Sequence, residues 1–198
     1  MSTRPSDEED AADMASLAAG RDAALDGLMA RHGERLFHYL IRLLQNEDDA
    51  SDLAQETFVR VYQHRTRFNP QARFSTWLYT IATNLVRSEY RWRKRRPHVS
   101  LEAENPETGH DFRETIADGR ASPSESILAD ERAELVRSAV RSLPDDLRVP
   151  LILFEYERKS QSEIAAILDC SAKAVEMRLY RARQQLKNKL SKLLQASE

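Results

Sequence analysis

The chain has 198 residues, 41% of them hydrophobic and 31% charged, a balance typical of a soluble protein with one or two domains. Its single cysteine excludes an intrachain disulfide, and no apolar run reaches the roughly 18 residues that a membrane span needs. The formal net charge of −2 conceals an alternation of acidic and basic stretches along the chain. Because the first residues also lack the apolar core of a signal peptide, we expect a cytoplasmic protein without membrane insertion.

The N-terminal half of the chain predicts an acidic tail followed by a helical domain. Residues 1–20 are small and acidic, and we expect them to be disordered. From Arg21 onward apolar residues recur at helical spacing, which predicts a domain over residues 21–97. Within it, a helix around residues 50–61 carries a polar outer face. The pattern alone assigns this face to solvent, and it consists of Asp52, Gln55 and Glu56.

A long helix with a basic end closes this domain. The preceding loop, residues 66–74, is broken by an Asn-Pro pair. The helix then carries six Lys and Arg residues between Arg87 and Arg96, with Tyr90 and Trp92 among them. Cations neutralise phosphates and flat rings stack on bases, so this run favours a nucleic-acid surface. The alternative is a helix C-terminus enriched in cations to suit the helix dipole.

A second helical domain follows a linker. Residues 98–129 contain Pro, Gly, Asn, Ser and acids with almost no apolar periodicity, which predicts a flexible acidic linker. Residues 130–195 then predict about four helices, with Ser142 as a helix cap and Pro150 inside the next helix. The expected fold class is therefore all-α, with two helical domains.

The end of the chain has the pattern of a helix-turn-helix. Ser160 and Glu163 have the spacing of a capping box, and Ser171 can cap a second helix after a short turn. In that helix Val175, Leu179 and Ala182 share one apolar face, while the opposite face is mainly polar and basic. Such a helix fits the major groove of DNA. The alternative is an ordinary helical hairpin with a solvated cationic face.

The sequence offers no catalytic constellation. It has five scattered histidines and neither a Gly-rich phosphate loop nor a metal-spaced Cys/His cluster, so we expect no enzyme activity, no metal and no cofactor. Cys170 is interpreted as a packed turn residue. A nuclease would need clustered acids to hold a metal, whereas the acids here lie in the linker or on outer helix faces.

Taken together, four motifs resemble those of bacterial RNA polymerase sigma factors, in particular the compact extracytoplasmic-function (ECF) group. The resemblance covers about residues 21–194, and the motifs stand in the order of that family. They are DASDLAQETFVRVY (Asp49–Tyr62), RFSTWLYTIATNLVRSEYRWRKR (Arg73–Arg95), SLPDDLRVPLILFEYE (Ser142–Glu157) and SEIAAILDCSAKAVEMRLYRARQQL (Ser162–Leu186).

The resemblance implies three sets of contact residues. Contacts to core polymerase are expected from Asp52, Gln55 and Glu56. Contacts to the −10 element, including a pocket for a flipped base, are expected from Phe68, Arg73, Trp77, Asn84, Arg87, Arg91, Arg93, Lys94 and Arg95, although Trp77 fits a core position equally well. Contacts to the −35 duplex are expected from Ser171, Lys173, Glu176, Met177, Arg178, Tyr180 and Arg181.

The resemblance also implies partners and a mechanism of binding without catalysis. The expected partners are promoter DNA, an anti-sigma factor, and core polymerase through the clamp helices of its largest subunit and the flap of its second. The acid Glu176 departs from the usual recognition-helix pattern, but it can accept a hydrogen bond from cytosine N4. A stand-alone helix-turn-helix regulator is the main alternative, and it would footprint promoters without polymerase.

Overall fold

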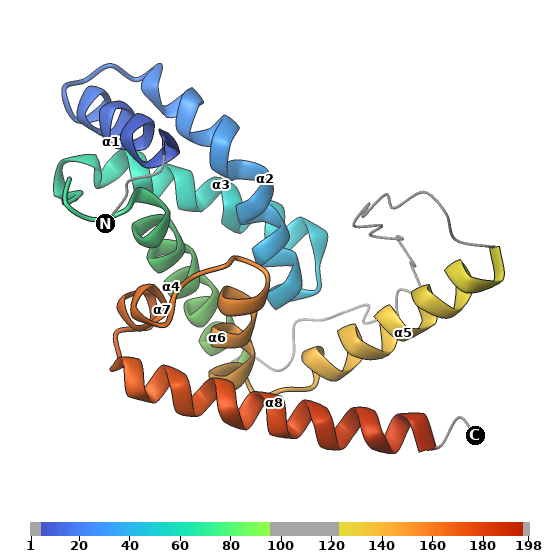
Figure 1. Cartoon of the computed structure of the whole chain (residues 1–198). Coiled ribbons are helices and arrows are strands. Elements are labelled where there is room, and N and C mark those ends of the chain that lie inside the picture. The colour runs from blue at the N-terminus through green and yellow to red at the C-terminus, as the bar shows by residue number, and fades with distance from the viewer. Residues whose placement is uncertain (1–4, 96–122, 196–198) are drawn as a thin grey trace.

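The protein is described by a computed structural model that covers residues 5–95 and 123–195, with side chains at 7–93 and 132–191. Within these residues all regular secondary structure is helical, as the sequence predicts (Figure 1). The elements are α1 (Pro5–Ala18), α2 (Ala24–Leu44), α3 (Glu47–Gln63), the 3-10 helix η1 (Arg65–Arg67), α4 (Phe74–Arg95), α5 (Pro123–Arg141), α6 (Asp145–Glu155), α7 (Gln161–Leu168) and α8 (Ala172–Gln195).

The first domain is built on α2, α3 and α4, which pack against one another. α2 ends at Gln45 in the left-handed conformation, and the side chain of Asn46 then caps α3 by accepting from the Asp49 N–H at 2.9 Å. The core between the helices is mainly apolar, and within it the hydroxyls of Tyr39 and Thr83 form a buried hydrogen bond of 2.8 Å. Long amphipathic helices with clear caps thus fix the position of α4.

The prediction of a disordered acidic tail at residues 1–20 is wrong for Pro5–Ala18, which form the helix α1. Met14 and Leu17, three residues apart, are fully buried against the first domain. Asp10 is 1% exposed and its carboxylate binds Arg31 at 2.9 Å and His32 at 2.8 Å. Burial alone would raise the pKa of Asp10, but these two partners outweigh it and hold the pKa below its ordinary value. Tertiary contacts therefore order a segment that its composition assigns to a tail.

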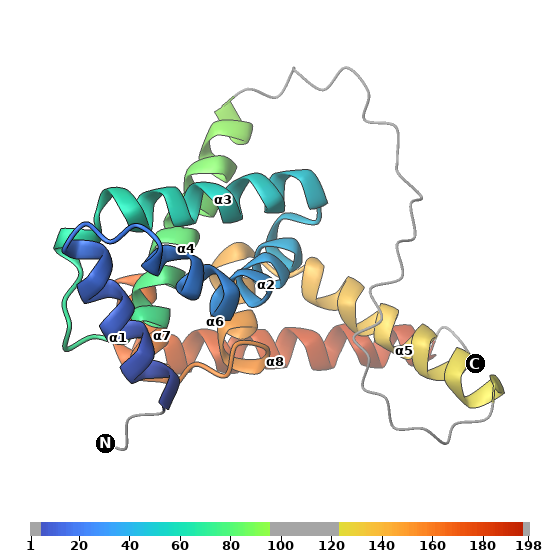
Figure 2. The ribbon, with the colours of Figure 1, turned by 90° about the horizontal axis from the view of Figure 1, so that it is seen from above.

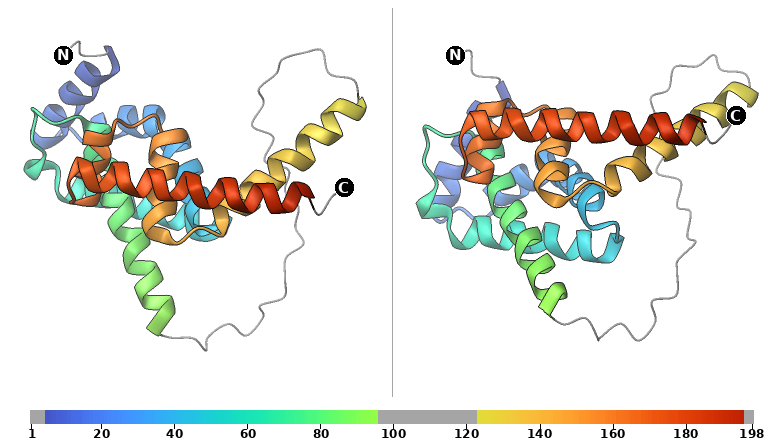
Figure 3. Two further views of the ribbon diagram at one scale, coloured as in Figure 1. Left: turned by 60° about the horizontal axis from the view of Figure 1, so that its bottom comes forward. Right: turned by 90° about the horizontal axis from the view of Figure 1, so that it is seen from below.

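The second domain differs in detail from the predicted boundaries. α5 begins at Pro123, so residues 123–129 of the predicted linker are helical, and the rest of that linker lies outside the described residues. Ser142 does not cap α6, because its hydroxyl donates to the Ala139 carbonyl and Pro144 holds the cap position. Pro150 is buried inside α6. α5 and the C-terminal half of α8 project together beyond the first domain (Figure 3).

The two domains pack on each other along α4. α7 lies against α4, and α6 lies against α2 (Figure 2). Lys159, in the loop between α6 and α7, donates to the Ser75 hydroxyl at 2.7 Å and sits 4.9 Å from the centre of the Tyr79 ring. The interface is thus rich in polar contacts, as is usual between domains of one chain.

The partly buried Lys159 predicts a stability that depends on pH. Burial lowers the pKa of Lys159 from 10.5 to about 8. The nearby Arg35 and Arg73 lower it as well, whereas Glu163 and Glu157 raise it. Between about pH 8 and 9.5 the Lys159 amine therefore binds fewer protons in the folded chain than in the unfolded chain, and its contribution to stability should increase with pH. We expect a gain of roughly 1–2 kcal/mol between pH 8 and 9.5, measured by urea unfolding.

The Lys159→Met variant should lack this gain, because it removes the titrating group. The matched control is Lys187→Met, which replaces an exposed lysine of α8 and should keep the gain. A wild-type stability that is constant or falls between pH 8 and 9.5 would contradict the prediction.

Candidate nucleic-acid interface

The helix-turn-helix forms as its sequence predicts. The Ser160 hydroxyl accepts from the Glu163 N–H while the Glu163 carboxylate accepts from the Ser160 N–H at 2.8 Å, which is a complete capping box. Asp169 ends α7 in the left-handed conformation with φ 52°. Ser171 then caps α8, because its hydroxyl accepts from the Ala174 N–H at 3.1 Å. These local bonds fix the angle at which α8 leaves the turn.

The outer face of α8 offers both apolar and charged groups to solvent. Tyr180 is 59% exposed and Met177 is 39% exposed, although both are large and apolar enough to favour burial. Arg181 is exposed beside them. Lys173 and Glu176 form an ion pair of 2.8 Å, so the unusual acid is partly neutralised in the free chain. This face combines apolar and hydrogen-bonding groups with a cation, which are the kinds of group that proteins use to contact base edges and phosphates.

Two of the residues predicted to read the −35 element lie at the turn. Ser171 uses its hydroxyl as the helix cap, so its side chain is already engaged in the free chain. Arg178 is only partly exposed, and its guanidinium lies 3.6 Å from the Cys170 sulfur. The structure thus brings the predicted set together on one helix, but it directs these two side chains toward the turn.

An aromatic cluster stands at the start of α4. The ring of Phe68, from the preceding loop, lies 5.3 Å from Trp77 and 6.2 Å from Phe74. Phe74 is buried, whereas Phe68 and Trp77 are partly exposed. Trp77 therefore contributes to the core and also to the surface. Partly exposed rings of this kind provide a stacking platform for an unpaired base.

Two of the arginines predicted to bind the −10 strand form ion pairs with acidic residues of the same chain. Arg73 pairs with Glu163 of α7 at 3.1 Å and lies 3.4 Å from Asp7 of α1. Arg93 pairs with Asp49 and with Glu89, and these bonds raise its pKa. Both guanidiniums are thus held in place by carboxylates of the same chain.

The rest of the predicted −10 surface follows α4 toward its basic end. Asn84 and Arg91 are exposed and lie seven residues apart, which places them on one side of the helix. Arg87 is partly buried. Lys94 and Arg95 belong to α4, but their side chains lie outside the described residues.

The polar face of α3 contains an exposed apolar residue that the sequence pattern does not single out. Asp52, Gln55, Glu56 and Val59 have the spacing of one helix face. Glu56 binds Arg60 at 2.7 Å, and Val59 is 46% exposed. An exposed apolar side chain among acids is typical of a protein contact surface. In the sequence, the clue to Val59 is its position seven residues after Asp52, which places the two residues on one face of the helix.

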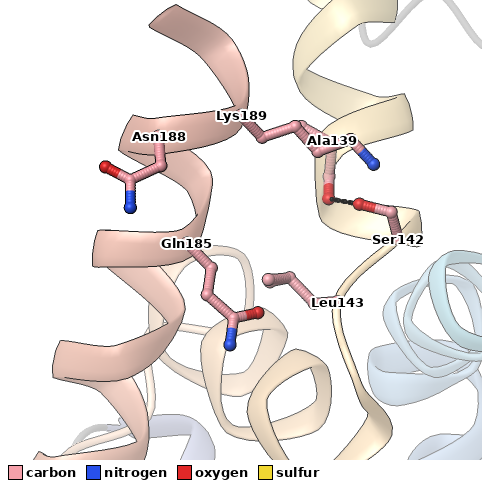
Figure 4. A pocket seen from close by; sticks show the side chains of 6 residues that line it. All are labelled: Ala139, Ser142, Leu143, Gln185, Asn188 and Lys189. Carbon is pink, nitrogen blue, oxygen red and sulfur yellow. Dashed lines mark hydrogen bonds between the residues drawn. The ribbon is translucent and has the colours of Figure 1, made fainter. Parts of the chain in front are cut away.

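A pocket of about 320 Å³ lies between α5 and α8 (Figure 4). Its lining is Ala139, Ser142, Leu143, Gln185, Asn188 and Lys189. The Ser142 hydroxyl is bonded to its own helix, so no residue pair there forms a nucleophile with a base. Over the described ranges we also find no group of three or more potential metal ligands and no helix able to cross a membrane.

Comparisons with known proteins agree with this arrangement. The family model of sigma-70 region 2 matches residues 28–96, and that of sigma-70 region 4 matches residues 133–186. The ECF RNA polymerase sigma-E factor of Escherichia coli K12 is 33% identical over 179 residues, covering 88% of this chain and 91% of the relative. The RNA polymerase sigma-H factor of Pseudomonas aeruginosa is 32% identical over 179 residues, covering 88% and 90%.

Solved structures share the fold. CnrH, in complex with the cytosolic domain of CnrY, has a TM-score of 0.66 at 30% identity, covering 96% of this chain and 99% of that one. RpoE of Bartonella quintana, in complex with the anti-sigma factor NepR, has a TM-score of 0.62 at 24% identity, covering 84% and 96%. With both sigma regions matched and relatives aligned over most of its length, the chain belongs to the ECF sigma factors of bacterial RNA polymerase, which initiate transcription.

Proposed function

We propose that this sigma factor reads the −35 element with α8 and captures unpaired bases of the −10 element on α4 and its preceding loop. The observation that supports this most strongly is the solvent exposure of Met177 and Tyr180 on the recognition helix. The first domain, residues 21–97, would bind core polymerase and the −10 element. The second domain, residues 130–195, would bind the −35 element.

The proposed mechanism is binding without catalysis. Flipping a base out of the duplex costs a few kcal/mol, which a fitted pocket with aromatic stacking can offset. Phe68 and Trp77 provide stacking rings, and Asn84, seven residues after Trp77 on α4, provides an amide that can hydrogen-bond a base edge. Binding energy alone would thus drive promoter melting.

The proposed partners are core polymerase, promoter DNA and an anti-sigma factor. The α3 face would bind the clamp helices of the largest polymerase subunit, and the second domain would bind the flap of the second subunit. An anti-sigma factor is proposed because RpoE of Bartonella quintana, which shares the fold, is complexed with one. Such a factor would act in the cytoplasm, where the polymerase is.

In vitro transcription with core polymerase on a promoter library tests this function. We expect transcripts only when the protein is added, and a common −35 and −10 sequence among the active promoters. Strong footprints on the same promoters without polymerase would instead favour a stand-alone regulator.

Loss of the α3 carboxylates should weaken binding to core polymerase. The double variant Asp52→Ala with Glu56→Ala removes two charges from the proposed contact face while retaining good helix formers. We expect a loss of roughly 1–3 kcal/mol, or about 5-fold to 150-fold in Kd, measured by titration with core polymerase. The loss should fall toward the lower end because Glu56 already pairs with Arg60.

The matched control removes the same charge elsewhere. Glu8 and Glu9 are exposed on α1, and their double replacement with Ala should leave the Kd for polymerase unchanged. Equal Kd values for the α3 variant and the wild type, with equal helix content by circular dichroism, would reject the assignment.

A further inference from the structure

Glu157 is a buried carboxylate at the boundary between the two domains. It follows α6 and is 5% exposed. The Tyr79 hydroxyl of α4 donates to one of its oxygens at 2.5 Å. From α2, Arg42 approaches the carboxylate to 3.5 Å and Arg35 to 3.8 Å. A residue of the second domain is therefore held by groups of the first domain.

This burial is specific to the closed arrangement. Removing a carboxylate from water is costly unless cations and donors surround it, and here the donor and both arginines belong to the other domain. If the domains separated, Glu157 would regain water and Tyr79 would lose its acceptor. The buried apolar residues of the two domains also form one cluster, so the Glu157 contacts add a charge-dependent part to an interface that is otherwise apolar.

Further polar contacts extend from Glu157 along α4. Near the start of the helix, Arg73 binds Glu163 of α7. Toward its end, Arg148 of α6 donates to the Tyr90 hydroxyl at 3.0 Å. The second domain thus contacts several turns of the helix assigned to the −10 element, through the packing of α7 on α4 (Figure 1) and the bond from Arg148 to Tyr90.

The closed chain cannot reach both promoter elements at once. By their names the elements lie roughly 25 base pairs apart, or about 80 Å at one turn of about 34 Å per 10 base pairs. α7, the first helix of the helix-turn-helix, instead packs directly on α4. Arg73, assigned to the −10 strand, is also occupied by an acid of α7.

We propose that Glu157 is the centre of an interdomain lock that holds the free factor closed and must open before it can read a promoter. The lock consists of Glu157 with Tyr79, Arg35 and Arg42. The functional consequence rests on the proposed sigma activity, whereas the closure itself is a property of the free chain. Engagement of polymerase and of separated promoter elements would supply the energy that opens it.

Two variants of the full-length chain test the lock. Glu157→Gln keeps the shape but removes the charge, and Tyr79→Phe removes only the hydroxyl. Small-angle X-ray scattering of each free protein should show a larger radius of gyration than the wild type. The Kd for core polymerase should fall several-fold, because less energy is spent on opening.

The matched control is Glu155→Gln. Glu155 lies two residues away, is exposed, and pairs with Arg183 of its own domain at 2.9 Å. Its replacement should change neither the radius nor the Kd. If Glu157→Gln lowers the helix content seen by circular dichroism, Tyr79→Phe decides the question.

An unchanged radius of gyration in the folded lock variants, or the same increase in the control, would overturn the proposal. These scattering results do not depend on polymerase. A factor that opens in the variants but binds no polymerase in any form would reject the proposed function and leave the lock intact.

Discussion

Replacing Asn84 with Ala should reduce transcription from intact duplex promoters while leaving binding to a −35 duplex unchanged. Asn84 is exposed on α4, on the same side as Arg91. If its amide reads a flipped base, the loss of that contact should cost about 1–3 kcal/mol, or about 5-fold to 150-fold in open complex at equilibrium. Permanganate footprinting beside abortive transcription measures opening and output separately.

A premelted −10 bubble separates base capture from other defects. The bubble removes the cost of unstacking, so it should restore part of the output of Asn84→Ala but not its base preference at −10. The control is Ser191→Ala, since the Ser191 hydroxyl makes the same kind of bond to a carbonyl of its own helix, that of Lys187, but lies on α8, outside the proposed −10 surface. Wild-type opening with unchanged −10 preference in Asn84→Ala would show that the pocket lies elsewhere.

The features predicted correctly from the sequence are those that local bonds determine. The capping box of Ser160 with Glu163 and the cap at Ser171 each involve residues three apart, so the pattern alone locates the helix-turn-helix. The apolar face of α8 is equally local, and its residues Val175 and Leu179 are buried as predicted. The helix-turn-helix can therefore be located from the sequence without knowledge of the tertiary contacts.

The features missed depend on contacts far apart in the chain. α1 is ordered because Asp10 meets Arg31 and His32, more than 20 residues away, and composition alone does not show this. Likewise Glu157 meets Tyr79 across 78 residues, and an acid at the end of a helix looks like ordinary surface. The assignment of Arg73 and Arg93 to DNA stays a prediction, and their ion pairs with Glu163 and Asp49 are visible only in the fold.

Arg181→Ala should weaken binding to the −35 duplex, and the way it does so should identify the contact. Arg181 is exposed on the face of α8 that also carries Met177 and Tyr180. A base-edge contact would cost about 1–3 kcal/mol and relax the sequence preference. A phosphate contact would instead lower affinity for all sequences and reduce the slope of log Kd against log salt by about one. Fluorescence anisotropy at several salt concentrations, on matched and mismatched duplexes, distinguishes the two.

Lys173 requires a paired experiment because it neutralises Glu176 in the free chain. Lys173→Ala removes a cation and also leaves an acid unpaired near the phosphates, so it should weaken binding more than Arg181→Ala. Adding Glu176→Gln should recover part of that affinity, and it should also relax preference for cytosine if Glu176 accepts from cytosine N4. Gln185→Ala, on the side of α8 that lines the pocket with α5, is the control and should bind normally. If the three outer-face variants bind the −35 duplex as the wild type does, with the same salt slope, then another surface of the second domain contacts DNA.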